Sequence, residues 1–253
     1  MRYGASLDLR FEETVEEFAE FLAGLGLDHV ELRQGYLDVH PEAPSAAELG
    51  ELAASTGLSY TFHAPFRDAN LGNLNGPLRR AAVDGVCRSL DAAVAAGAGA
   101  VVVHGGSVPR RYPERVRARA REGAVRSLRE CARHADEVGV PLCVENQRRK
   151  GREVRNTETP GRLAALVEDV GVDSEYLCVA VDVGHAKVTG VDPLAFVERF
   201  GDRIRVAHLH DNDGTADDHD PLPGFEAVAG RIGADYNVLE MKSLADVERC
   251  VAG

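Results

Sequence analysis

Carboxylate and imidazole side chains end seven short apolar runs of this 253-residue chain. In a typical run, Val101, Val102 and Val103 directly precede His104. The residues at these ends are Glu31, His63, His104, Glu145, Asp182, His208 and Glu240. Two more histidines follow shortly after such positions, His185 after Asp182 and His219 after Asp217. Asp, Glu and His without Cys form the ligand set of a divalent transition metal or a Mg-like ion, so the pattern indicates metal chemistry.

The apolar runs themselves have the length and composition of buried β-strands. The predicted strands are 3–7, 29–32, 60–63, 100–104, 142–145, 178–183, 205–209 and 237–240. Several are apolar at consecutive positions, which is typical of strands that are covered on both faces.

The segments between these strands carry helix signals. Apolar residues recur at helical spacing from Val15 to Leu25, and Gly26 can end this first helix. Ser45 and Glu48 have the spacing of a capping box for the second helix, which ends near residue 57. Two more helices are predicted to open with Thr159-Pro160 and Asp192-Pro193, in which the first residue is the N-cap and the proline is the first helical residue. The other predicted helices are 78–96, 113–138, 225–232 and 244–251.

Eight strands and eight helices in strict alternation predict a parallel sheet. At this length the sheet is expected to close into a single (β/α)8 TIM barrel that spans residues 1–253. An open doubly wound sheet is the alternative, but no Gly-x-Gly-x-x-Gly follows the first strand. A parallel barrel brings the carboxyl ends of its strands together, and so many acids and imidazoles on one ring would be destabilising without a cation. We therefore expect a metal site at this ring.

Composition and charge indicate a cellular location and argue against some classes of binding partner. The 41 Asp and Glu outnumber the 29 Lys and Arg, giving a net charge of -12, which argues against nucleic acid and anionic membranes as partners. The start of the chain lacks the apolar region of a signal peptide, and the longest weakly polar stretch, 92–103, is too short to span a bilayer. The five cysteines are an odd number with no Cys-x-x-Cys spacing, which is typical of reduced thiols. We expect a cytoplasmic protein.

Basic residues nevertheless gather where the mouth of the barrel is expected. Arg148 and Arg149 lie in the loop 147–155 after the fifth strand, and they bind an anionic substrate or pair with nearby acids in a solvated loop. Glu31 either orients the substrate or forms a buried salt bridge. The acidic loop 212–224, which contains Asp217 and His219, is solvated or folds over the site.

The order of these motifs resembles one known family over essentially the whole chain. The motifs are His63-Ala64-Pro65-Phe66 with Asp68 and Asn70-Leu71, Val103-His104-Gly105-Gly106, Glu145-Asn146, Asp182-Val183-Gly184-His185, His208-Leu209-His210-Asp211, Asp217-x-His219 and Glu240. They are similar to those of the xylose-isomerase-like TIM barrels, which include sugar and sugar-phosphate isomerases and epimerases together with endonuclease IV. In the isomerases, the resemblance implies that one divalent ion (Mn, Zn, Co or Mg) is held by Glu145, Asp182, His208 and Glu240. In endonuclease IV, five further ligands map to His63, His104, His185, Asp217 and His219.

The resemblance implies two enzymatic functions, between which the sequence favours the first. The first is a metal-dependent isomerase or epimerase of a small sugar or sugar phosphate, in which Glu145 and Glu240, from opposite sides of the barrel, move a carbon-bound proton through an enediolate-like intermediate. The alternative is an endonuclease IV-like multi-zinc phosphodiesterase acting on abasic DNA. The charge of -12, the absence of Trp and the few aromatic residues argue against it. A third possibility, a metal-binding barrel without turnover, is disfavoured because both central glutamates are present. A homo-oligomer is a further expectation from the family.

Overall fold

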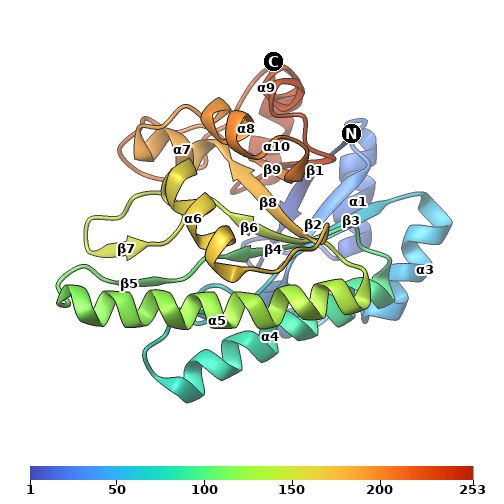
Figure 1. Cartoon of the computed structure of the whole chain (residues 1–253). Helices are drawn as coiled ribbons and strands as arrows, with labels where there is room; N and C mark the ends of the chain where they lie inside the picture. Colours follow the sequence, from blue (N-terminus) through green and yellow to red (C-terminus); the bar gives the residue numbers. More distant parts are fainter. Residues whose placement is uncertain (253) are drawn as a thin grey trace.

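Eight parallel strands close into one barrel, which confirms the predicted (β/α)8 fold (Figure 1). The computed structural model describes residues 1–252, so Gly253, which the predicted domain includes, lies outside the described residues. The barrel strands are β1 (Arg2–Leu7), β2 (His29–Arg33), β3 (Ser59–His63), β4 (Val101–His104), β6 (Leu142–Glu145), β8 (Leu177–Asp182), β9 (Ile204–Leu209) and β10 (Tyr236–Leu239). Around the ring they follow the order β1-β10-β9-β8-β6-β4-β3-β2.

Helices between the strands form the outer layer. They are α1 (Val15–Gly24), α3 (Ala46–Thr56), α4 (Gly76–Ala96), α5 (Glu114–Val138), α6 (Pro160–Val170), α8 (Leu194–Phe200), α9 (Phe225–Ile232) and α10 (Leu244–Val251). The predicted capping box at Ser45 is present, and Thr159 caps α6 with Pro160 at its first position. The prediction at α8 was wrong by one residue, because Pro193 is the N-cap and the Asp192 carboxylate accepts from the Leu194 amide at 2.9 Å.

The strict alternation that the sequence predicts is interrupted by short additional elements. They are α2 (Gln34–Val39), β5 (Ser107–Pro109), β7 (Glu153–Arg155), α7 (Val183–Thr189) and the 3₁₀ turn η1 (Gly201–Arg203). Val183, expected in a strand, instead begins α7, because the Asp182 carboxylate accepts from the His185 amide and caps a helix there. β5 and β7 pair antiparallel outside the barrel, and Figure 1 shows them at the left, where the carboxyl ends of the strands open.

Apolar side chains fill the space inside and outside the sheet. Inside the barrel, a cluster of apolar side chains includes Val102, Cys143, Cys178 and Val238. All five cysteines of the chain are free thiols. Gly4 allows β1 and β2 to approach closely, because a Cβ at this position would lie 1.7 Å from the backbone oxygen of His29. The interior is therefore closed by apolar packing, and its charged side chains gather toward the carboxyl end of the strands.

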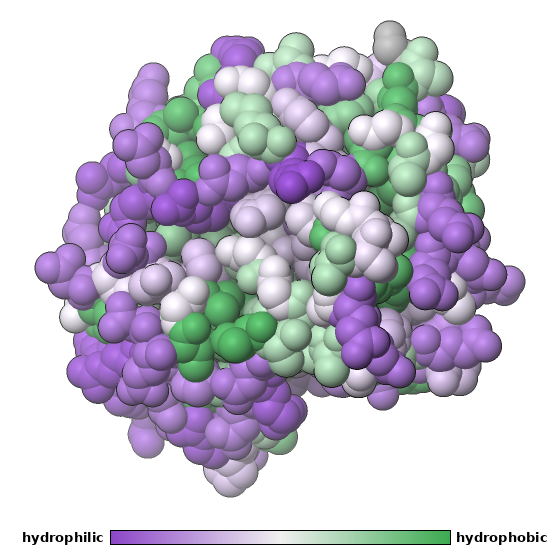
Figure 2. All heavy atoms as spheres, turned by 90° about the vertical axis from the view of Figure 1, so that its right-hand side faces the viewer, coloured by the Kyte–Doolittle hydropathy of each residue, from purple (hydrophilic) through white to green (hydrophobic). Residues whose placement is uncertain are grey.

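The opposite end of the barrel presents an ordinary polar surface. Figure 2 faces the end toward which α4 and α5 run, and hydrophilic residues there are interspersed with several smaller hydrophobic areas. Among residues 1–252, no helix combines the length and the apolar composition that crossing a bilayer requires. The carboxyl end of the barrel, where the acids and histidines converge, is therefore the candidate functional end.

A buried histidine in the barrel wall predicts a pH dependence of stability. His29 is fully buried between the hydroxyls of Ser59, at 2.9 Å, and Thr61, at 3.0 Å. Burial lowers the pKa of His29 to about 4 from an ordinary value of 6.5. The unfolded chain therefore takes up a proton that the folded chain excludes, so stability present above pH 6.5 is lost as the pH falls toward 4, by about 3 kcal/mol in all.

Urea unfolding of the metal-free protein at pH 7.5 and pH 5 tests this expectation. The wild type should lose about 2 kcal/mol more than His29→Gln over this interval, because glutamine has no proton to gain. An equal loss in both proteins would contradict the assignment to His29.

Candidate metal centre

His208, near the carboxyl end of β9, lies at the centre of the converging side chains. It is fully buried, and its Nδ1 faces three carboxylate oxygens: Glu240 Oε1 at 3.3 Å, Glu145 Oε1 at 3.5 Å and Asp182 Oδ2 at 4.0 Å. Its other nitrogen, Nε2, lies 3.1 Å from Glu31 Oε2. The four residues predicted to hold one metal ion thus face one another around a single ring nitrogen.

The chemistry of these four residues fits a divalent cation. His208 Nδ1 is buried and makes no hydrogen bond within the described part of the chain. Since Nε2 faces the Glu31 carboxylate and keeps its proton there, Nδ1 is the nitrogen that would give up its proton and offer a lone pair to a cation. Three carboxylate oxygens and one imidazole nitrogen match the ligands that Zn, Mn, Co and Mg accept.

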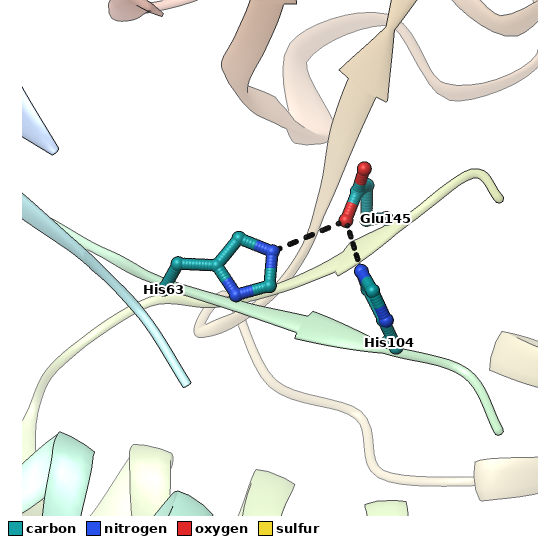
Figure 3. A group of neighbouring side chains, drawn as sticks. All are labelled: His63, His104 and Glu145. Carbon is teal, nitrogen blue, oxygen red and sulfur yellow. Dashed lines mark ion pairs between the residues drawn. The ribbon is translucent and has the colours of Figure 1, made fainter. Parts of the chain in front are cut away.

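A second group of donors adjoins the first through Glu145. His63 Nε2 lies 3.4 Å from Glu145 Oε2, and His104 Nε2 lies 2.9 Å from the same oxygen. Figure 3 shows the two imidazoles meeting at this carboxylate from β3 and β4, the strands that precede β6 in the ring. The Nδ1 of His63 lies 2.9 Å from the carbonyl oxygen of Ala64, so Nε2 is free for the acid or for a metal ion.

A third group comes from the acidic loop after β9. The loop is closed at its base by two backbone hydrogen bonds of 2.8 Å between Asp211 and Asp220, and it folds back over the ring. His219 has a φ of 51°, a left-handed conformation that a histidine rarely adopts, and its Nδ1 contacts the Glu240 carbonyl oxygen at 2.9 Å. Asp217 Oδ2 then lies 3.4 Å from His185 Nε2 and 3.6 Å from His219 Nε2. The loop is therefore part of the site.

The charges of this ring are strongly coupled. Burial alone would raise the pKa values of Glu145 and Glu240, but His104 beside Glu145 and Arg33 beside Glu240 hold both pKa values well below the ordinary range. Burial would likewise lower the pKa of His208, and the charges of Glu31 and Glu240 instead raise it well above its usual value. The carboxylates are thus balanced by protons on imidazoles, a positive charge that a divalent cation supplies when it binds.

All three groups of donors open into one cavity of ≈ 430 Å³. Its polar lining includes His63, His104, Glu145, His185, Asp217, His219 and Glu240. Basic side chains also line it: Arg33, Arg67, Arg148, Lys150 and Arg155. A cavity of this size accommodates a small molecule, and the mixture of acids and bases selects a polar one.

Comparison with known proteins identifies the family of this barrel. The sequence profile described as "Xylose isomerase-like TIM barrel" matches residues 19–237. The chain belongs to the xylose isomerase-like TIM barrel family. An uncharacterized protein of Methanocaldococcus jannaschii is 29% identical over 87% of this chain and 73% of its own length.

Solved structures agree with this assignment. The structure of a D-tagatose 3-epimerase-like protein is 27% identical, with a TM-score of 0.82 over 98% of this chain and 94% of that one. A Thermus thermophilus protein soaked with ZnCl2 is 24% identical, with a TM-score of 0.74 over 100% and 97% of the two chains, and it shares the fold.

Within this xylose isomerase-like barrel, the nine predicted ligand positions all lie at one end, but the prediction for Arg149 needs correction. Glu145 and Glu240 come from β6 and β10, which lie three positions apart in the eight-stranded ring and therefore on well-separated sides of it. Arg149 is exposed and does not line the cavity, because its amide donates to Thr189 Oγ1 at 2.8 Å and fixes this part of the loop. Glu31 is fully buried against His208, which matches the predicted alternative of a buried salt bridge.

Two residues of the xylose isomerase-like centre were missed in the sequence. Arg33 lies one position beyond the predicted end of the second strand, and its Nη2 lies 2.6 Å from Glu240 Oε1. His210 lies two residues after His208, a spacing that places both on one face of a strand, and its Nε2 lies 3.1 Å from Asp182 Oδ1. Gly184 makes room for this imidazole, since a Cβ there would lie 2.0 Å from His210 Cε1.

Proposed function

We propose that the protein is a divalent-metal-dependent isomerase or epimerase of a small sugar or sugar phosphate. The observation that carries this proposal is the free Nδ1 of His208, which faces Glu145, Asp182 and Glu240 while Nε2 is engaged by Glu31. The 27% identity to a D-tagatose 3-epimerase-like protein along nearly the whole chain supports the same class of reaction. The cavity volume of ≈ 430 Å³ suits a monosaccharide or its phosphate.

Two glutamates are available to move the proton of the substrate. Glu145, Asp182, His208 and Glu240 would hold a divalent cation, which would supply Lewis-acid stabilisation of negative charge on the substrate oxygens. Glu145 and Glu240 both line the cavity, and their lowered pKa values keep them ionised as proton acceptors. Arg33, in ion-pair contact with Glu240, holds this carboxylate toward the cavity. His185, which also lines the cavity, is placed to donate a hydrogen bond to a substrate hydroxyl.

Metal content per chain is the first test of this proposal. Protein purified without chelator is expected to contain one tightly held divalent ion by elemental mass spectrometry, and chelation should abolish epimerisation of ketoses or ketose phosphates. Restoring Mn, Co, Zn or Mg should restore activity. A protein that converts these substrates equally well after exhaustive chelation would contradict the metal-dependent mechanism.

One observation favours a second candidate, an endonuclease IV-like multi-zinc phosphodiesterase. The His63, His104, Glu145 group and the His210, Asp217, His219 group could each hold a further ion beside the central one. Two or three zinc ions would activate water and neutralise a phosphodiester. Two or three Zn per chain, together with cleavage of abasic-site DNA and no epimerisation, would favour this function over the first.

A further inference from the structure

Three basic side chains of the segment 148–155, which ends with β7, line the cavity without close acidic partners. Arg148, Lys150 and Arg155 all line the cavity. Their nearest carboxylate oxygens lie at 3.3 Å from Arg148 Nε, 3.7 Å from Lys150 Nζ and 3.6 Å from Arg155 Nε. None of these distances is that of a charge-assisted hydrogen bond, which is about 2.7–2.9 Å.

Several arginines elsewhere in this acidic protein pair directly with a carboxylate. Arg10, Arg80 and Arg205 donate to carboxylate oxygens at 2.7, 2.7 and 2.8 Å, respectively. With 41 Asp and Glu in the chain, acidic partners are abundant. The three cavity cations lack such short ion pairs although they line a cavity that acidic residues share.

Arg155 is the most constrained of the three. Its side chain is 13% exposed, and its buried Nε makes no hydrogen bond within the described residues. Its guanidinium donates once, from Nη1 to the Arg148 carbonyl oxygen at 3.3 Å. Burial and the charge of Arg148 lower the pKa of Arg155, although Glu153 acts in the opposite direction. A buried cation with unused donors at a cavity wall is stabilised by an anion that binds there.

The two-stranded sheet outside the barrel fixes this cation in place. Arg155 pairs with Ser107 across β5 and β7, and Glu153 pairs with Pro109, so alternation puts Glu153 and Arg155 on the same face. Arg110 clamps the sheet by donating to the Gly151 and Glu153 carbonyl oxygens at 3.1 and 2.9 Å. A guanidinium held on a paired strand loses little entropy when it binds a ligand.

We propose that Arg148, Lys150 and Arg155 form a subsite for the phosphoryl group of the substrate, so that the natural substrate is phosphorylated. The proposal rests on the proposed function for the rest of the substrate. Two guanidiniums and one ammonium suit a dianion better than a monoanion, and arginine binds phosphate oxygens through paired N–H groups. Glu153, which lies between Lys150 and Arg155, competes with the anion for both cations.

Titration calorimetry with inorganic phosphate tests the subsite on the full-length protein, both as purified and after chelation. Phosphate is expected to bind in both states, because the three cations do not depend on a metal ion. Arg155→Gln should weaken binding at least tenfold, through the loss of charge-assisted hydrogen bonds. Glu153→Gln should tighten binding about threefold or more, since it removes the competing carboxylate. Arg149→Gln, a matched change in the same segment outside the cavity, should leave binding unchanged.

Four results would contradict the subsite, and a fifth would contradict only the proposed reaction. Binding that needs the metal ion, or that is equal in wild type and Arg155→Gln, would place the phosphate elsewhere. Acetate binding as tightly as phosphate would make it a carboxylate subsite. If Arg155→Gln does not fold, the Glu153→Gln variant tests the subsite instead. Unchanged or weaker phosphate binding by Glu153→Gln would show that Glu153 does not compete with the anion for Lys150 and Arg155. Phosphate binding with this pattern but no epimerisation of any sugar phosphate would refute the proposed reaction and leave the subsite standing.

Discussion

Replacing Glu145 or Glu240 with glutamine should lower kcat for epimerisation about a thousandfold, since a positioned general base contributes ~10²–10⁴. Both carboxylates line the cavity and are ionised, whereas an amide of the same shape cannot accept the proton. The fold should persist, because glutamine fills the same volume. Steady-state kinetics at saturating metal, with circular dichroism of each variant, measures both effects.

The interpretation of these variants needs a control for metal binding, because both glutamates are also proposed ligands. Asp182→Asn changes a third carboxylate that faces His208 but does not line the cavity, so excess metal should rescue it more fully. Glu137→Gln, an exposed change on α5, should leave kcat unaltered. A glutamine variant with at least a tenth of the wild-type kcat would remove that glutamate from proton transfer.

Replacing Glu31 with glutamine should lower the affinity for a divalent metal ion ~10–100-fold, although Glu31 does not line the cavity. The Glu31 carboxylate lies 3.1 Å from His208 Nε2 and thereby holds the ring with Nδ1 aimed at the other acids, where it can exchange its proton for a cation. A neutral amide at this position can accept less strongly and can also present its donor end to the imidazole. Competition with a metal-binding dye measures the affinity directly.

Two further substitutions serve as comparisons for the Glu31→Gln variant. Thr61→Val removes the hydroxyl that donates to Glu31 at 3.2 Å, so it should weaken metal binding less than the loss of the Glu31 charge. Glu51→Gln, an exposed acid on α3, should have no effect. Equal affinities in wild type and Glu31→Gln would show that the pairing with His208 does not orient the metal ligand.

The carboxyl-end residues could be predicted from sequence because the topology allows them only one position. Once the strands are parallel and closed, His63, Glu145 and His208 must meet, even though 145 positions separate the first from the last. The capping residues Ser45 and Thr159 act within one turn of their own helices, so local sequence sufficed for them as well.

The remaining features depend on contacts between distant segments. β7 exists only because it pairs with β5, some 45 residues earlier, and its three residues carry no strand pattern of their own. Arg148 and Arg149 are adjacent in sequence, and only the contact of the Arg149 amide with Thr189 determines which of the two reaches the cavity. The position of Glu31 under His208 likewise depends on packing inside the barrel.

The sheet formed by β5 and β7 lies outside the closed ring that carries the metal-binding candidates. Mutations in β5 and β7 can therefore alter the cavity wall while the metal-binding candidates of the barrel stay the same. Substrate preference can then change during evolution without a change in these residues. The backbone pairing of Ser107 with Arg155 and of Pro109 with Glu153 joins the two strands into one transferable unit. A graft into another barrel would need both segments at once, since either strand alone would leave half of its ladder unpaired.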